Sequence, residues 1–141
     1  MKNLQLSLIR IWFEMTKAGI KPEDYRNITP YWCSRFILVD GEKMPQKWWD
    51  KWVKSYKNET KQDEYFDFLQ RYFAQTEEKR SSFSFKQFTQ NTMTLGYPKK
   101  GDAERTLILE HKGIEIRTGN PEWGAEPGKI YFVIKHGNKL S

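Results

Sequence analysis

The segment AGIKPEDYRNITPYW, residues 18–32, gathers side chains that could perform chemistry within fifteen positions. It contributes three charged side chains and two aromatic ones that could face a ligand: Lys21, Asp24, Arg26, Tyr25 and Trp32. The planar guanidinium of Arg26 could bind a phosphate or a base edge through two parallel hydrogen bonds. Alternatively, Asp24 and Arg26 share one face of a strand and form an ion pair that fixes the end of a sheet, while Trp32 covers the core. Both interpretations remain open.

Lys21 could serve either as a nucleophile or as a binding group. A nucleophilic lysine must lose its proton near neutral pH, which requires burial or a neighbouring cation. Asp24, three residues further on, would hold the lysine charged if the two side chains touch. This spacing favours a Lys21 that grips a phosphate or a base carbonyl over one that attacks a carbonyl carbon.

Two later segments could add to the same site. In RTGNPEWGAEPGKIYFVIKHG, glycines and prolines flank Trp123, so this indole is either a stacking platform held by stiff turns or a plug at one end of the core. In LGYPKKGD, Tyr97 and Lys99 occupy a turn that lacks the spacing of a phosphate-binding loop. We expect this turn at the rim of a cleft, where its lysines could touch backbone phosphate.

Composition narrows the classes of function. The chain of 141 residues carries a formal net charge of +6, and 16% of its residues are aromatic, which suits a polyanion with exposed bases. The same figures also suit a soluble protein with an aromatic core.

Cys33 is the only cysteine, which excludes an intramolecular disulfide and favours a cytoplasmic protein. The two histidines lack companions at metal-ligand spacing, and no apolar run is long enough for a membrane span, so we expect no metal, cofactor or membrane.

Hydrophobic patterns predict an α+β domain over residues 1–141. Alternation predicts a strand at 4–8, and helical spacing follows until Gly19. The other expected elements are a strand or extended loop at 22–28, a helix at 30–38 capped by the hydroxyl of Thr29, and helices from Pro45 and at 63–75. Strands are expected at 83–88, 104–119 (split at Lys112–Gly113) and 129–135, and segment 90–102 ends in a turn. The last strand could pair with the first and close a small barrel.

Residues 43–87 are expected to form a helical pair inserted into this domain. Trp48, Trp52 and Tyr56 recur every four residues, which predicts one aromatic stripe flanked by lysines. The stripe could dock the insertion on the barrel, bind single-stranded nucleic acid, or contact a protein partner.

The motif W-F-x-M-x-x-A-G-I-K-P-E-D-Y-R, followed by PYW and by GNPEWGAEPGKIYFVIKHG, resembles the ASCH family, named after a domain of the activating signal cointegrator. The family hallmark falls on Gly19, Lys21, Asp24 and Arg26, and the resemblance covers residues 4–36 and 88–137. It implies a PUA-like β-barrel surrounded by helices, of the kind found in small bacterial and phage proteins, with RNA bound in a cleft. One branch of the family hydrolyses acetylated cytidine with a lysine, a threonine three residues later and a distant glutamate; here Asp24 stands at the threonine position.

Together these patterns predict a protein that binds RNA or a modified nucleotide in a basic cleft. The candidate ligand contacts are Lys21, Tyr25, Arg26, Trp32, Tyr97, Lys99 and Trp123. The alternatives are a hydrolase of nucleosides or RNA that uses Lys21 and Asp24, and a protein-interaction module that uses the aromatic insertion.

Overall fold

A computed structural model of the chain describes residues 2–56, 69 and 83–140, with side chains left undescribed at 53–56. The chain falls into two compact units, one formed by residues 1–26 and 87–141 and the other by residues 27–86. The predicted insertion at 43–87 lies almost wholly within the second unit, which also contains the segment before it. The expected helix at 63–75 lies outside the described residues except for Leu69.

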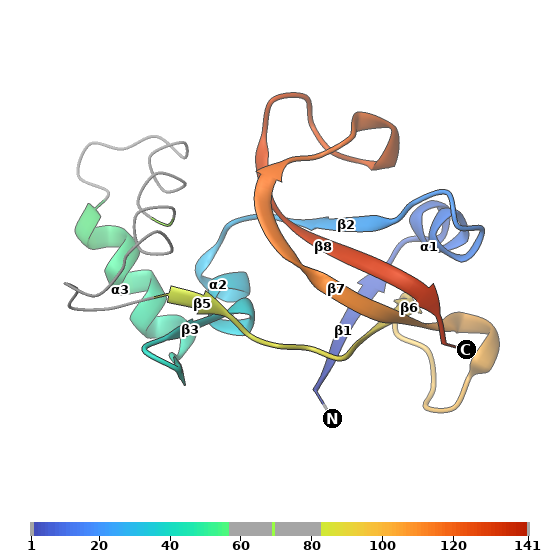
Figure 1. The fold of residues 1–141 in the computed structure, drawn as a ribbon, viewed down its shortest axis with the longest axis horizontal. Coiled ribbons are helices and arrows are strands. Elements are labelled where there is room, and N and C mark those ends of the chain that lie inside the picture. The colour runs from blue at the N-terminus through green and yellow to red at the C-terminus, as the bar shows by residue number, and fades with distance from the viewer. Residues whose placement is uncertain (1, 57–68, 70–82, 141) are drawn as a thin grey trace. The chain divides into compact units, whose positions relative to one another are not determined.

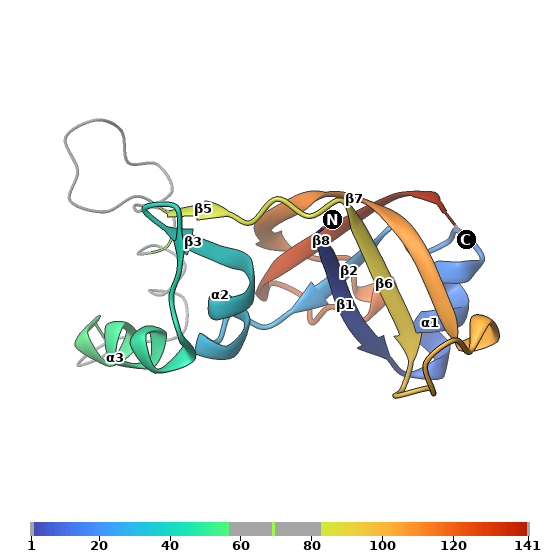
Figure 2. The same ribbon diagram turned by 90° about the horizontal axis from the view of Figure 1, so that it is seen from below.

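The first unit is built on a curled five-stranded sheet that forms a half-barrel (Figures 1 and 2). Its strands, in spatial order, are β1 (Asn3–Leu8), β6 (Gln90–Leu95), β7 (Thr106–Thr118), β8 (Ile130–Lys139) and β2 (Glu23–Arg26). β1 and β6 run parallel, and every other neighbouring pair is antiparallel. The expectation that the last strand pairs with the first is wrong, because β8 lies between β7 and β2. The two edges of the curled sheet are β1 and β2.

β7 is one continuous strand where the sequence predicted a break at Lys112–Gly113. Its register with β8 shifts between Leu109 and His111 and again between His111 and Ile114. Such bulges bend a strand without ending it, and Gly113 accommodates the local geometry with a φ of 111°. The glycine therefore marks a bend in a long strand, which helps the sheet to curl.

Alternating apolar side chains fill the core of the first unit. Leu4 and Leu6 on β1 face the same side as Met93 on β6, and all three are buried. Helix α1 (Arg10–Lys17) buries Phe13 in this unit and ends before Gly19, whose φ of 77° confirms the predicted helix stop. The described residues contain no helix long and apolar enough to cross a membrane.

A polar row crosses this apolar interior. The Asn91 side chain is fully buried; its Nδ2 lies 2.7 Å from Nδ1 of His136, and its Oδ1 lies 2.7 Å from Nδ1 of His111. An amide nitrogen donates and an amide oxygen accepts, so Nδ1 of His136 is the acceptor and Nδ1 of His111 the donor. The register pairs the two histidines across β7 and β8, although they lie 25 positions apart in sequence. No group of three or more metal-ligating side chains occurs among the described residues.

The second unit contains helices α2 (Pro30–Phe36) and α3 (Gln46–Tyr56) and a small sheet of β3 (Ile37–Val39), β4 (Glu42–Lys43) and β5 (Phe83–Phe85). Thr29 caps α2 as predicted, because its hydroxyl accepts a hydrogen bond from the backbone N–H of Trp32. The helix stops at Phe36, two residues earlier than expected. Trp49, from the row beside the predicted aromatic stripe, is the fully buried tryptophan, and its ring packs 5.2 Å from that of Phe83.

The environment of His136 predicts that the stability of the fold depends on pH. Burial lowers the pKa of His136 to about 4, although Asp24 acts in the opposite direction. Between about pH 6.5 and 4 the unfolded chain binds a proton that the folded chain does not, so stability falls as the pH falls through this window, by up to about 3 kcal/mol. Urea unfolding at several pH values should show this loss in the wild type and a smaller loss in His136→Gln. Identical pH profiles would contradict this assignment.

Candidate functional site

A hollow of about 240 Å³ lies in the first unit where its two edge strands, β1 and β2, come together. We call it the seam pocket; it is lined by Ser7, Leu8, Ile9, Trp12, Lys21, Asp24, Tyr25, Arg26, Trp123 and Gly124. Trp123 comes from the 3-10 turn η2 (Pro121–Trp123), nearly 100 residues after β2 in the chain. Segments from both ends of the sequence therefore meet at one concave site.

Asp24 bridges two cations in this pocket. Its Oδ1 lies 3.1 Å from Nζ of Lys21, and its Oδ2 lies 2.8 Å from Nε of Arg26. Lys21 is only 2% exposed and donates a second hydrogen bond, of 2.8 Å, to the backbone carbonyl of Glu23. A charge buried to this extent requires both an ionic partner and further hydrogen bonds, and Lys21 has both.

Arg26 also connects the two edges of the sheet. Its Nη2 donates a 2.9 Å hydrogen bond to the backbone carbonyl of Ser7, so a side chain on β2 reaches the backbone of β1. The predicted ion pair between Asp24 and Arg26 is therefore present and does fix the end of the sheet. The same ion pair lines the pocket, so the structural and ligand-binding interpretations are compatible.

Aromatic rings line the pocket around this charged cluster. Nζ of Lys21 lies 6.0 Å from the ring centroid of Trp12 and 5.6 Å from that of Tyr25, within the range of cation–π attraction. Gly124 has a φ of 99°, and a Cβ atom there would lie 2.9 Å from the ring of Trp12. A glycine is required at this point for the turn that carries Trp123 to approach Trp12.

Tyr25 holds that turn in position through its hydroxyl group. The hydroxyl donates a 2.6 Å hydrogen bond to Glu23 and accepts one of 2.9 Å from the backbone N–H of Asn120, just before η2. Burial, followed by the nearby carboxylate of Glu23, raises the pKa of Tyr25. Burial also opposes ionisation of Glu23, but hydrogen bonds from Arg117 and Tyr25 leave the pKa of this carboxyl below its usual value. The phenol is thus a neutral positioning group whose ring lines the pocket.

The structure brings together most but not all of the candidate residues. Lys21, Asp24, Tyr25, Arg26 and Trp123 line the seam pocket, whereas Trp32, Tyr97 and Lys99 do not. Trp32 belongs to the second unit, where its ring stacks on Phe36 at 5.1 Å. Tyr97 and Lys99 lie exposed in the loop after β6.

The sequence did not single out Trp12 and Ser7 as site residues. Trp12 follows the same helical spacing as Phe13 and Thr16, and this pattern predicts a shared helix face but no site. In the structure Phe13 and Thr16 are buried while Trp12 is only partly so. Ser7 contributes its backbone carbonyl, which no side-chain pattern can reveal.

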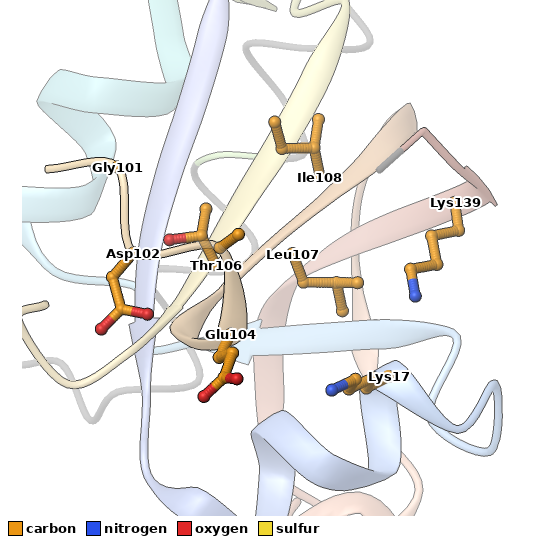
Figure 3. A pocket seen from close by; sticks show the side chains of 9 residues that line it. Lys17, Gly101, Asp102, Glu104, Thr106, Leu107, Ile108 and Lys139 are labelled. Carbon is orange, nitrogen blue, oxygen red and sulfur yellow. The ribbon is translucent and has the colours of Figure 1, made fainter.

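A larger hollow of about 480 Å³ lies elsewhere in the first unit (Figure 3). Figure 3 shows Lys17 and Lys139 on one side of Leu107, and Asp102 and Glu104 on the other. It contains no aromatic side chain, and its charged residues are surface groups. Its volume exceeds that of the seam pocket. Of these two hollows, however, only the seam pocket contains a buried ionic cluster and aromatic rings.

Comparisons of the chain with protein families, with curated proteins and with solved structures give no match. Its function is therefore inferred from the geometry of the pocket.

Replacing Asp24 by Asn should destabilise the first unit by about 3–5 kcal/mol, because Lys21 would remain buried without its ionic partner. The matched control is Glu115→Gln. Glu115 pairs with Arg117 and Lys135, but it is 45% exposed, and such surface pairs contribute less than about 1 kcal/mol. Urea unfolding monitored by tryptophan fluorescence measures both effects. Equal losses of unfolding free energy in the two variants would show that the Asp24 cluster contributes no more to stability than a surface ion pair.

Proposed function

We propose that the seam pocket binds one base of an RNA chain or of a modified nucleotide, and that the first unit is a PUA-like barrel of the ASCH type. The observation that carries this proposal is the position of Lys21, Asp24 and Arg26 beside Trp12 and Trp123 in a single pocket. Aromatic faces stack on any base, and charged groups beside them can hydrogen-bond to its edge.

The chemistry of the pocket suits the edge of a base. The Watson–Crick edge of each base combines hydrogen-bond donors with acceptors, and it is accessible in single-stranded RNA. The carboxylate of Asp24 accepts hydrogen bonds, and the cations on either side of it donate them. The ammonium of Lys21 uses two of its donors on Asp24 and the carbonyl of Glu23, which leaves one for a ligand.

Size and charge point to the same class of ligand. At about 240 Å³ the pocket is smaller than the ~300–1,000 Å³ typical of sites for drug-sized molecules, so it suits a single ring system. The formal net charge of +6 adds a general attraction for phosphate. The remainder of a nucleotide would lie outside the pocket, in this positive field.

The position of the family hallmark supports the proposed fold. Lys21, Asp24 and Arg26 all line the pocket, and Gly19 ends the helix that carries Trp12. A curled half-barrel with a pocket at its edge strands is compatible with the arrangement that the ASCH resemblance implies.

The contacts of Lys21 favour binding over hydrolysis. A nucleophilic lysine needs an unshared electron pair directed at its substrate. Here the amino group acts as a donor to a carboxylate and to a backbone carbonyl. Asp24 is the only carboxylate among the residues that line the pocket, and both its oxygens hold cations. It is therefore poorly placed to activate water.

Fluorescence anisotropy with a labelled single-stranded RNA tests the proposal. The wild-type chain should bind, with an affinity that falls steeply as salt increases. Trp123→Ala and Arg26→Gln should each weaken binding about tenfold or more. Lys139→Gln removes the same charge as Arg26→Gln but lies in the other hollow, and it should have a much smaller effect.

Chromatography of the recovered RNA distinguishes binding from catalysis. Intact RNA is expected. Turnover that is abolished in Lys21→Ala would favour the hydrolase instead, and equal affinities for Arg26→Gln, Trp123→Ala and Lys139→Gln would contradict a base-binding seam pocket.

A further inference from the structure

We infer that the loop after β6 supplies a second base-binding position next to the seam pocket, with Tyr97 as its stacking surface. The ligand would then be a single-stranded chain of two or more nucleotides rather than a free nucleotide. This inference rests on the proposed function of the seam pocket, and it extends that site by one neighbouring position.

Backbone pairing places the loop directly beside the pocket. β1 and β6 run parallel with Leu8 opposite Leu95, and the backbone N–H of Gly96 donates a 3.0 Å hydrogen bond to the carbonyl of Leu8. Leu8 and Ile9 line the seam pocket. Neighbouring strands lie about 4.8 Å apart, so Tyr97, the next residue after Gly96, starts about one strand spacing from the end of β1 that lines the pocket.

Tyr97 presents its ring to solvent to an unusual degree. It is 96% exposed, more than any other large hydrophobic residue in the described part of the chain. In the described part of the chain, the hydroxyl of Tyr97 makes no hydrogen bond and its ring contacts no other aromatic ring. Pro98 restricts the backbone of the preceding residue, and Gly96 holds the turn with a φ of 63°. The backbone of this loop is therefore restricted, so stacking on a base has to fix mainly the side-chain torsions of Tyr97.

The surface between the two positions suits a connecting nucleotide backbone. Ile9 lines the pocket, is 65% exposed and directly follows Leu8, so it offers apolar surface at the end of β1 next to this loop. Lys99 and Lys100 follow in the same loop, are exposed, and make no ion pair among the described residues. An aromatic face followed by two cations is the combination that binds a base and its adjoining phosphates in single-stranded nucleic acids.

Two probes separate this inference from the proposed function. One is a labelled single-stranded RNA of about ten nucleotides, and the other is a ribonucleoside 5′-monophosphate, tested with each of the four bases. If the second position exists, Tyr97→Ala should lower affinity for the RNA about fivefold to 50-fold and leave affinity for the monophosphates unchanged. Trp123→Ala should lower affinity for both probes.

The matched control is Tyr31→Ala, which removes another exposed tyrosine, one that belongs to α2 of the second unit. It should leave affinity for the RNA within about twofold of the wild type. If Tyr97→Ala has no more effect than Tyr31→Ala while Trp123→Ala still weakens binding, the second position is refuted and the seam pocket stands. If the wild type binds neither probe, the proposed function is refuted and the second position with it.

The salt dependence of RNA affinity in variants of Lys99 and Lys100 tests the second position independently of Tyr97. Replacing Lys99 and Lys100 by Gln should reduce the slope of log affinity against log salt by about 1.4, because single-stranded contacts each contribute about 0.7. The control pair, Lys43→Gln with Lys47→Gln, changes the net charge equally from exposed positions in the second unit. Equal changes in slope for the two pairs would show a general charge effect and would overturn the assignment of the loop.

Discussion

One carboxylate holds together the part of the structure on which the proposed function depends. Asp24 is 5% exposed and gives one oxygen to Lys21 and the other to Arg26. Neither the lysine nor the aspartate could be buried alone, because an unpaired charge in a protein interior costs several kcal/mol. Arg26 then extends the cluster to the backbone of β1 through the carbonyl of Ser7. The three residues form an ionic unit that also closes the gap between two strands.

The connection of β1 to β2 through a side chain explains why there is a pocket between them. A ladder of backbone hydrogen bonds between β1 and β2 would bring the strands to about 4.8 Å and leave no space between them. A side-chain connection is longer, and the resulting hollow is lined by rings and charges. The second support comes from Tyr25, which holds the turn before Trp123 and so keeps a distant segment at the same site. The lining of the pocket and the connection between the two edge strands thus use the same residues.

Local signals in the sequence predicted local structure well. The alternation of Leu4, Leu6 and Leu8, the stop at Gly19 and the cap at Thr29 each act within a few residues, and each is confirmed. The spacing of Asp24 and Arg26 predicted a shared face and an ion pair for the same reason. The sequence predicts a helix through residue 38, whereas residues 37 and 38 begin β3, because a short apolar run fits a strand and a helix equally well.

Features that depend on register could not be read from the sequence. The contact of Asn91 with both histidines and the reach of Arg26 to Ser7 join residues at least 19 positions apart. The pairing of β8 with β7 likewise joins residues at least 12 positions apart. Trp12 illustrates the same limit, since its ring lies against Gly124, more than 100 positions later in the chain. Trp32 follows the motif closely in sequence, but the chain enters its second unit at residue 27.

The most direct test of the account is a crystal structure of the chain in complex with a short single-stranded RNA. The account predicts one base inside the seam pocket, against Trp12 or Trp123, with its edge hydrogen-bonded to Asp24 or Arg26. A complex in which the RNA contacts other surfaces and leaves that pocket without a base would contradict it.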